Sequence, residues 1–407
     1  MSVPVLRRSL PEDARSERAP LRFATISSEE EFAGLDEDWD GLVRAMPRPS
    51  PFLLHGWLLE WCRHYGEGCN LAVEAAFRGD TLVGALPLIA FKHRGLRVLT
   101  FVGARQSSLA DALVTEGEGF ELVEALADRV LESEHDYVDL FGISDEGLLA
   151  RLRGRRGLRL FQRIAAPVLD LSEGWETKYR AMTNSKKRSH HGRRRRQLAQ
   201  LGRVAVSVAR TLSELEPALE EAFRIHELRW RDRPDGSGFV TETGKRFNRA
   251  VLPPLAKLDA TRIVSLKLDG RPIAFSWYFL LERRAYLHRL AFDPAFARCS
   301  PGLVNALDTL ELVNAEGAEF VEFLGGGERY KLELADRCEP LFLGLGLPGT
   351  AVGRSVVAAR TGWLRLRQLG KQSELVQKLY YATAPARQRL RRPRDVLRPS
   401  GIQLSGD

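Results

Sequence analysis

The sequence predicts a mixed α/β (α+β) protein with two similar halves, each a mixed, mostly antiparallel sheet flanked by helices. Segments 70–91 and 262–281 each contain two apolar runs joined at a turn with a glycine, Gly79 in the first and Gly270 in the second. Helical patterns and a short apolar run follow each segment, and that run reads YVDLFG in the first case and FVEFLG in the second. An order of elements that recurs within one chain is typical of a duplicated domain.

The bulk composition is that of a folded protein without a membrane span. The chain has 407 residues, 44% hydrophobic and 28% charged, which is enough for two domains. No apolar run approaches the roughly 20 residues of a membrane helix, and no secretory signal is visible. The four cysteines have neither metal-ligand nor disulfide spacing. We therefore expect reduced thiols, no metal site, no transmembrane segment and a cytoplasmic location.

The order of patterns predicts five segments. Residues 1–20 combine mixed charge with few apolar side chains, which is typical of a disordered lead. We expect the first domain at residues 21–173, a basic linker helix at 174–202, and the second domain at 203–347. Helices and a basic tail are expected at 348–407.

Local patterns then place each element in turn. Ser27 or Ser28 is expected to cap a helix, with Glu30 and Glu31 placed for a capping box. In the first half we expect strands at 21–26, 97–103, 111–115 and 137–142, a hairpin at 70–91, and helices at 52–66 and 121–133. In the second half we expect a linker helix broken near Gly192, strands at 204–210, 285–292, 319–325 and 341–347, a hairpin at 262–281, helices at 215–232 and 303–313, and a flexible loop at 233–239.

The loop ARCSPG, between the strand at 285–292 and the following helix, is a candidate anion site. It brings Arg298, Ser300 and Gly302 to the start of a helix, where Pro301 suits the first position. The first N–H groups of a helix have no internal partner and its dipole is positive there, so phosphate oxygens are favoured. We expect a side chain at Gly302 to intrude on the ligand at little cost to the fold.

The stretch FDPAFARCSPGLV resembles the pyrophosphate loop of the GNAT acyltransferases, whose usual form is Q/R-x-x-G-x-G/A. Gly302 matches the last glycine, Ser300 replaces the first, and the arginine is displaced by one place to Arg298. With Tyr-Lys after the next strand, this variant resembles the tandem-GNAT subgroup of CelD/BcsL-type (cellulose biosynthesis) acetyltransferases and FemABX peptidyltransferases. The likeness covers roughly residues 50–345. The linker sequence TNSKKRSHH departs from the R-x-N-L-R-R-like core common in that subgroup.

The resemblance implies acetyl-CoA or another acyl-CoA as co-substrate and direct attack by the acceptor, without a covalent enzyme intermediate. In GNAT folds two strands splay apart, which here would free backbone groups of Leu290, Ala291 and Phe292 for the pantetheine and the thioester oxygen. The loop residues expected to bind the donor are Arg298, Cys299, Ser300, Gly302 and Leu303. For Cys299, a nucleophilic role and simple packing are both open.

Three residues are candidates for proton transfer. Glu322 lies on a short strand, where burial would raise the pKa of its carboxyl towards that of a general base; alternatively, it is a partly exposed glutamate at a strand end. His288 is either a second candidate base or a hydrogen-bonded core histidine. Tyr330 resembles the tyrosine that protonates the leaving thiolate in many GNAT enzymes, or it only packs.

Two further residues are candidates for substrate binding. Lys331 either pairs with a phosphate or faces water, and Asp111 resembles a recurrent acidic position of the subgroup. In the first half, TEGEGFE stands where the second has ARCSPG, and Glu116 and Glu118 would repel a pyrophosphate with no Arg or Lys nearby. We therefore expect the first half to be degenerate for the donor and to serve acceptor binding or structure.

Basic residues concentrate at 178–203 and 386–398. Such runs are either solvated helix faces or contacts with an anionic substrate, tRNA or an acidic surface. Three functions remain open. One is an acyl-CoA-dependent N- or O-acyltransferase on a small-molecule or saccharide acceptor, such as a polysaccharide precursor. The others are FemABX-like transfer from aminoacyl-tRNA and a catalytically inactive double-GNAT binding module.

Overall fold

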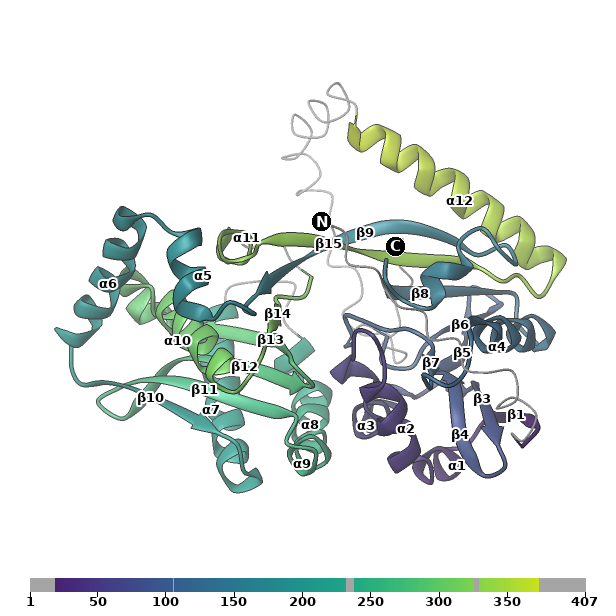
Figure 1. Cartoon of the computed structure of the whole chain (residues 1–407), viewed down its shortest axis with the longest axis horizontal. Helices are drawn as coiled ribbons and strands as arrows, with labels where there is room; N and C mark the ends of the chain where they lie inside the picture. Colours follow the sequence, from purple (N-terminus) through teal and green to yellow (C-terminus); the bar gives the residue numbers. More distant parts are fainter. Residues whose placement is uncertain (1–18, 105, 232–237, 326–328, 373–407) are drawn as a thin grey trace.

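The computed structural model describes residues 19–104, 106–231, 238–325 and 329–372, and it consists of two helix-flanked halves side by side (Figure 1). The strands are β1 (Leu21–Ile26), β2 (Cys69–Leu71), β3 (Val73–Arg78), β4 (Thr81–Leu86), β5 (Leu88–His93), β6 (Leu96–Phe101), β7 (Leu113–Val114), β8 (Tyr137–Ser144), β9 (Arg159–Asp170), β10 (Val204–Ala209), β11 (Thr261–Leu268), β12 (Arg271–Leu281), β13 (Arg284–Phe292), β14 (Phe320–Glu322) and β15 (Arg337–Gly346).

The α-helices are α1 (Glu29–Ala33), α2 (Asp36–Arg44), α3 (His55–Tyr65), α4 (Phe120–Glu132), α5 (Trp175–Met182), α6 (Ser185–Ala199), α7 (Leu212–Trp230), α8 (Glu242–Ala250), α9 (Leu252–Lys257), α10 (Pro301–Ala315), α11 (Arg329–Leu334) and α12 (Ala351–Gln372). Short 3-10 turns are η2 (Pro51–Leu53), η3 (Leu149–Leu152), η4 (Gly238–Val240) and η5 (Pro294–Cys299). No helix of the described residues is long and apolar enough to cross a membrane.

Local signals in the first half have the expected effect. The Ser28 side chain accepts the Glu31 N–H and Glu31 bonds back to the cap, so the predicted capping box is confirmed. The turn between β3 and β4 contains Gly79 with φ +59°, a left-handed conformation that glycine adopts without strain. The predicted hairpin continues differently: after Pro87 the chain leaves the four-stranded sheet (β1-β3-β4-β7), and β5 enters a second sheet.

The second sheet has 11 strands in the order β10-β11-β12-β13-β14-β9-β15-β8-β6-β5-β2 and runs through both halves. Its centre is a long antiparallel ribbon of β9 and β15, which runs along the top of the first half to α11 in Figure 1. One end of β9 pairs with β14 of the second half, while β15 pairs with β8 of the first. Each half therefore completes the sheet of the other.

The linker belongs structurally to the second half. The expected break at Gly192 is wrong, because Gly192 lies inside α6. The break lies before α6 instead, where the Asn184 side chain accepts the Lys187 N–H and starts a new helix. Both α5 and α6 pack against α10.

One hydrophobic core continues across the boundary between the halves. Phe52 and Trp57 of the first half pack edge-on against Phe279 of the second, with ring centroids 5.7 and 5.6 Å apart. Edge-to-face pairs of this kind add to the stabilisation from burial. Most of the expected lead, most of the loop expected at 233–239 and the tail beyond residue 372 lie outside the described residues.

Candidate active site

Strands β13 and β14 diverge at the centre of the second half. They pair in parallel only from Arg284 to Tyr286, whereas β13 continues beside β12 as far as Phe292. A β-bulge on β13 marks the point of divergence: Trp277 and Tyr278 of β12 pair with Arg289 and Leu287, which leaves His288 without an opposite residue. From there on, the β14-facing edge of β13 has no paired strand within the described chain.

The direction of the backbone groups along this open edge follows from the hydrogen bonds between β13 and β12. Asp293 donates its N–H to the Ile273 carbonyl next to β12, at 2.8 Å. Neighbouring residues of an antiparallel strand present their N–H and C=O groups to alternate edges. Ala291 therefore faces β12, and Leu290 and Phe292 present their backbone groups to the open edge.

The turn at the start of α10 has the features expected of the anion loop. Ser300 adopts a left-handed conformation (φ 52°, ψ 52°), and its carbonyl accepts the N–H groups of Leu303 and Val304. Pro301 has no N–H. The Gly302 N–H makes no hydrogen bond to any described group, so it is the first donor that the helix offers to a ligand.

Gly302 has a second reason to be glycine, which corrects the expectation from the sequence. The residue is buried, and a Cβ added there would lie 2.8 Å from Cδ1 of Phe292 on β13. A side chain at this position therefore collides with the Phe292 ring. The expectation that substitution costs the fold little was wrong.

An open cleft of about 880 Å³ lies between α6, the start of α10 and α11. It is lined by Asn184, Lys186, Lys187, His190, His191, Ser300, Leu303, Tyr330 and Glu333. The structure thus brings together three residues singled out in the sequence: Ser300, Leu303 and Tyr330. The basic residues beside them come from the N-terminal part of α6.

Two arginines attach α6 to the loop before α10 and to α10 itself. Arg194 donates from Nη1 to the Arg298 carbonyl at 2.6 Å, and Arg195 forms an ion pair with Asp308 of α10. The side chain of Arg298 is exposed, and neither Arg298 nor Cys299 lines the cleft. The basic linker helix is therefore one wall of the cleft, which sequence reasoning had not placed there.

Two histidines of the second half have a lowered pKa. His191 lines the cleft, and burial followed by the charge of Lys187 lowers its pKa; its Nδ1 lies 2.8 Å from the Tyr179 hydroxyl. His288 sits on the sheet face towards the first half, among Phe52, Trp57, Trp277 and Phe279. Burial, assisted by the charge of Arg289, lowers the pKa of His288 well below its ordinary value.

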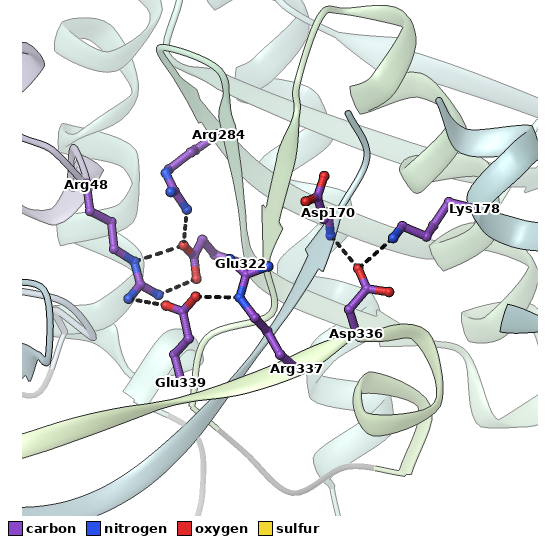
Figure 2. Close-up of polar contacts among 8 residues, drawn as sticks. All are labelled: Arg48, Asp170, Lys178, Arg284, Glu322, Asp336, Arg337 and Glu339. Atoms are coloured by element: carbon purple, nitrogen blue, oxygen red, sulfur yellow. Dashed lines mark hydrogen bonds and ion pairs between the residues drawn. The ribbon is translucent and has the colours of Figure 1, made fainter. Parts of the chain in front are cut away.

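Glu322 lies where the two halves meet and is only 1% exposed (Figure 2). Its carboxylate accepts hydrogen bonds from Nε and Nη2 of Arg48 at 2.9 and 2.6 Å, and from Nη1 of Arg284 at 2.8 Å. Arg48 also pairs with Glu339, which in turn binds Arg337. The structure gives Glu322 an anchoring role that sequence reasoning missed; its role as a general base stays a prediction.

Lys331 and Asp111 do not line the cleft. The Lys331 ammonium donates to the Gly325 carbonyl at 3.2 Å and is 8% exposed. Asp111 accepts three backbone N–H groups, those of Ala112, Leu148 and Leu149, beside a small cavity that Arg48 also lines. Burial raises the pKa of Asp111 to about 6.

The corresponding loop of the first half differs from the expectation in one respect. Glu118 accepts two hydrogen bonds from Arg78, at 2.5 and 2.9 Å, so the expected absence of a nearby basic residue was wrong. The fold supplies Arg78 from the end of β3, 40 residues away in sequence. The segment before α4 nevertheless carries Glu118 as well as Glu116, whereas the loop ARCSPG at the start of α10 carries Arg298 and no acidic residue.

Comparison with known proteins agrees with this geometry. Residues 185–332 match the family model described as Acetyltransferase (GNAT) domain. Similar solved structures are FemX (12% identity, TM-score 0.55, 79% of this chain and 96% of that one) and a conserved protein of unknown function from Bacteroides thetaiotaomicron (14%, 0.52, 79% and 99%). The C-terminal domain of a putative lysylphosphatidylglycerol synthetase from Agrobacterium fabrum is also similar (13%, 0.51, 81% and 95%).

No curated protein matches the sequence. At these identities the structural likenesses show the fold alone. They confirm the mixed α/β class and the GNAT-like architecture predicted from the sequence.

Proposed function

We propose that this protein is an acyltransferase that binds an acyl-CoA, such as acetyl-CoA, in the cleft between α6, α10 and α11. The observation that carries the proposal is the divergence of β13 from β14 next to the start of α10. This arrangement offers a free N–H at Gly302 to a phosphate and an open strand edge at Leu290 and Phe292 to an extended pantetheine arm. A donor with a charged head and a hydrogen-bonding arm fits both features.

Electrostatics support the placement of the diphosphate. Lys186, Lys187 and His190 line the cleft beside Ser300 and Leu303. Lys187 has an acidic neighbour, Glu333, with Nζ 3.3 Å from its carboxylate. A helix N-terminus flanked by lysines favours phosphate oxygens.

The transfer would proceed by direct attack. The acceptor nitrogen or oxygen bonds to the thioester carbon, and the developing oxyanion is stabilised by backbone N–H groups on the open edge of β13. The C–S bond then breaks, the thiolate takes a proton from Tyr330, and the acceptor gives its proton to a base. Glu322 and His288 remain the candidate bases, and both lie towards the junction of the halves, from which the acceptor would approach.

The acceptor is proposed to be an amine or hydroxyl of a small molecule or saccharide, such as a polysaccharide precursor. A second candidate is transfer from aminoacyl-tRNA, which the cationic wall of α6 favours, since a phosphate backbone binds lysine and arginine in a salt-dependent way. The similarity to FemX is compatible with this alternative but, at 12% identity, concerns the fold.

The two donors are separated by one assay on the full chain. Purified protein is incubated with acetyl-CoA and a panel of amino sugars and amines, and free CoA is quantified by chromatography. CoA release that depends on the acceptor supports the proposal. Binding of charged tRNA without CoA release supports the second candidate, and the lack of either reaction leaves a binding module.

A further inference from the structure

Helix α12 packs on the first half through one face only. Val357, Thr361 and Leu364 are at most 5% exposed and lie on the side facing the sheet. On the same side, Arg360 pairs with Asp139 of β8 at 2.7 Å. This face explains why the helix docks on the outer side of the β9–β15 ribbon (Figure 1).

The opposite face of α12 is exposed and uncharged. It carries Val352, Ser355, Ala359, Gly362, Trp363 and Leu366, which helical spacing places on one side. Val352 is 56%, Trp363 47% and Leu366 70% exposed. Leucine and tryptophan at such exposure on one stripe mark an interaction surface, since scattered single residues would not align.

Positive charge borders this apolar stripe. Arg354 and Arg365 flank it on one side and Arg367 on the other, where the guanidinium lies 5.2 Å from the Trp363 ring centre. The helix has five basic residues and no acidic one. Beyond it, residues 373–407 add seven basic and three acidic residues to the sequence.

A cationic groove adjoins the stripe. It has a volume of about 160 Å³ between α12 and β9, and Arg163 and Arg367 both line it. Neither arginine forms an ion pair with a described acidic residue, and burial together with the charge of Arg367 lowers the pKa of Arg163. Two arginines that share a groove without a carboxylate are suited to an anionic group such as a phosphate.

We propose that the outward face of α12 docks on an anionic phospholipid surface. The apolar stripe would enter the headgroup boundary, and the flanking arginines and the groove would contact lipid phosphates. An interfacial helix has this combination of a Trp/Leu face and basic borders. Charge argues against the other occupants, because a second α12 and the chain's own tail are both positive and would repel this face.

The test is flotation of the full-length protein with vesicles of phosphatidylcholine, with and without phosphatidylglycerol. We expect binding only to the anionic vesicles and a loss of binding as salt increases. Leu366→Gln should lower the partition coefficient for these vesicles about tenfold, as expected for the loss of one buried leucine side chain. Leu201→Gln, at a leucine that is 55% exposed elsewhere, is the matched control and should bind as wild type does.

Further variants make each outcome decisive. Arg365→Gln with Arg367→Gln should remove the preference for anionic vesicles. A second double variant, Arg391→Gln with Arg392→Gln, changes the tail and leaves α12 intact. If this variant loses binding while Leu366→Gln binds as wild type does, the tail alone binds lipid and the proposal fails. The proposal also fails if sedimentation shows that Leu366→Gln dissociates a dimer, because a second copy then covers this face. Leu366 is 70% exposed, so its replacement should leave the fold intact, and a thermal melt verifies this.

Discussion

Arg48, in the segment after α2, and Glu322, at the end of β14, are 274 residues apart in sequence and meet through two parallel hydrogen bonds of 2.9 and 2.6 Å. Burial works against the charge of Arg48, but attraction to Glu322 and Glu339 raises its pKa above the ordinary value. The side chains are 5% and 1% exposed. This pair therefore fixes the first half to the strand next to the proposed donor site.

Removal of one partner should destabilise the whole protein. We expect Arg48→Met to lower the free energy of unfolding by about 3–5 kcal/mol, because it leaves buried carboxylates with fewer partners. Arg44→Gln is the matched control, since Arg44 also joins the halves through Glu282 at 3.0 Å but both side chains are exposed. The control should cost less than about 1 kcal/mol. Equal losses in urea unfolding would remove the special role of the Arg48–Glu322 pair.

Glu322→Gln separates an anchor from a general base. If Glu322 serves mainly as an anchor, the variant should lose stability, yet its turnover below the melting temperature should stay within about threefold of wild type. A loss of about a hundredfold or more with unchanged donor affinity would instead identify Glu322 as the base. Steady-state kinetics at low temperature, with circular dichroism as a folding control, decide between the two.

Acid should destabilise the fold through buried histidines. Burial, with the charge of Arg289 adding to it, lowers the pKa of His226 to about 4. Between this value and the ordinary value near 6.5, the unfolded chain binds a proton that the folded protein does not, so stability falls as pH falls. His226 should account for about 2 kcal/mol of the loss between pH 7 and pH 5.

His226→Phe tests this linkage, because phenylalanine keeps the ring contacts with Trp230 and Phe239. Urea unfolding at the two pH values should show a smaller loss for the variant than for wild type. An identical loss in both proteins would assign the acid sensitivity to other groups.

The basic residues of α6 should differ in function along the helix. Lys186→Gln with Lys187→Gln should weaken the donor roughly tenfold and flatten the salt dependence, because these lysines line the cleft. Arg193→Gln with Arg196→Gln should stay within about twofold, since both are exposed and neither forms an ion pair in the described chain. The opposite ranking in donor titrations would move the anion site to the far face of α6.

Local chemistry explains which parts of the fold could be predicted from the sequence. The capping box at Ser28 and the hairpin turns at Gly79 and Gly270 depend on neighbouring residues, and all three were predicted. The start of α10 was also predicted, since Pro301 and Gly302 carry a local signal. These features need no knowledge of distant strands.

Contacts between segments that are far apart in the chain could not be predicted from the sequence. The Arg48–Glu322 pair, the Arg78–Glu118 pair and the pairing of β9 with both β14 and β15 join residues that no local pattern relates. The contact of Gly302 with Phe292 was missed for the same reason, because Phe292 lies on the preceding strand and only the folded chain brings the two together. Tertiary packing therefore determines both the Arg48–Glu322 pair and the close contact between Gly302 and Phe292.

Calorimetric titration of the full chain with acetyl-CoA tests the central claim most directly. We expect one donor site per chain, in the second half, and a loss of at least about tenfold in affinity for Leu303→Glu, which places a negative charge in the cleft. Leu201→Glu, which is exposed outside the cleft, should bind as wild type does. Two equivalent sites, or undiminished binding by a folded Leu303→Glu variant, would contradict the assignment of this cleft to the acyl donor.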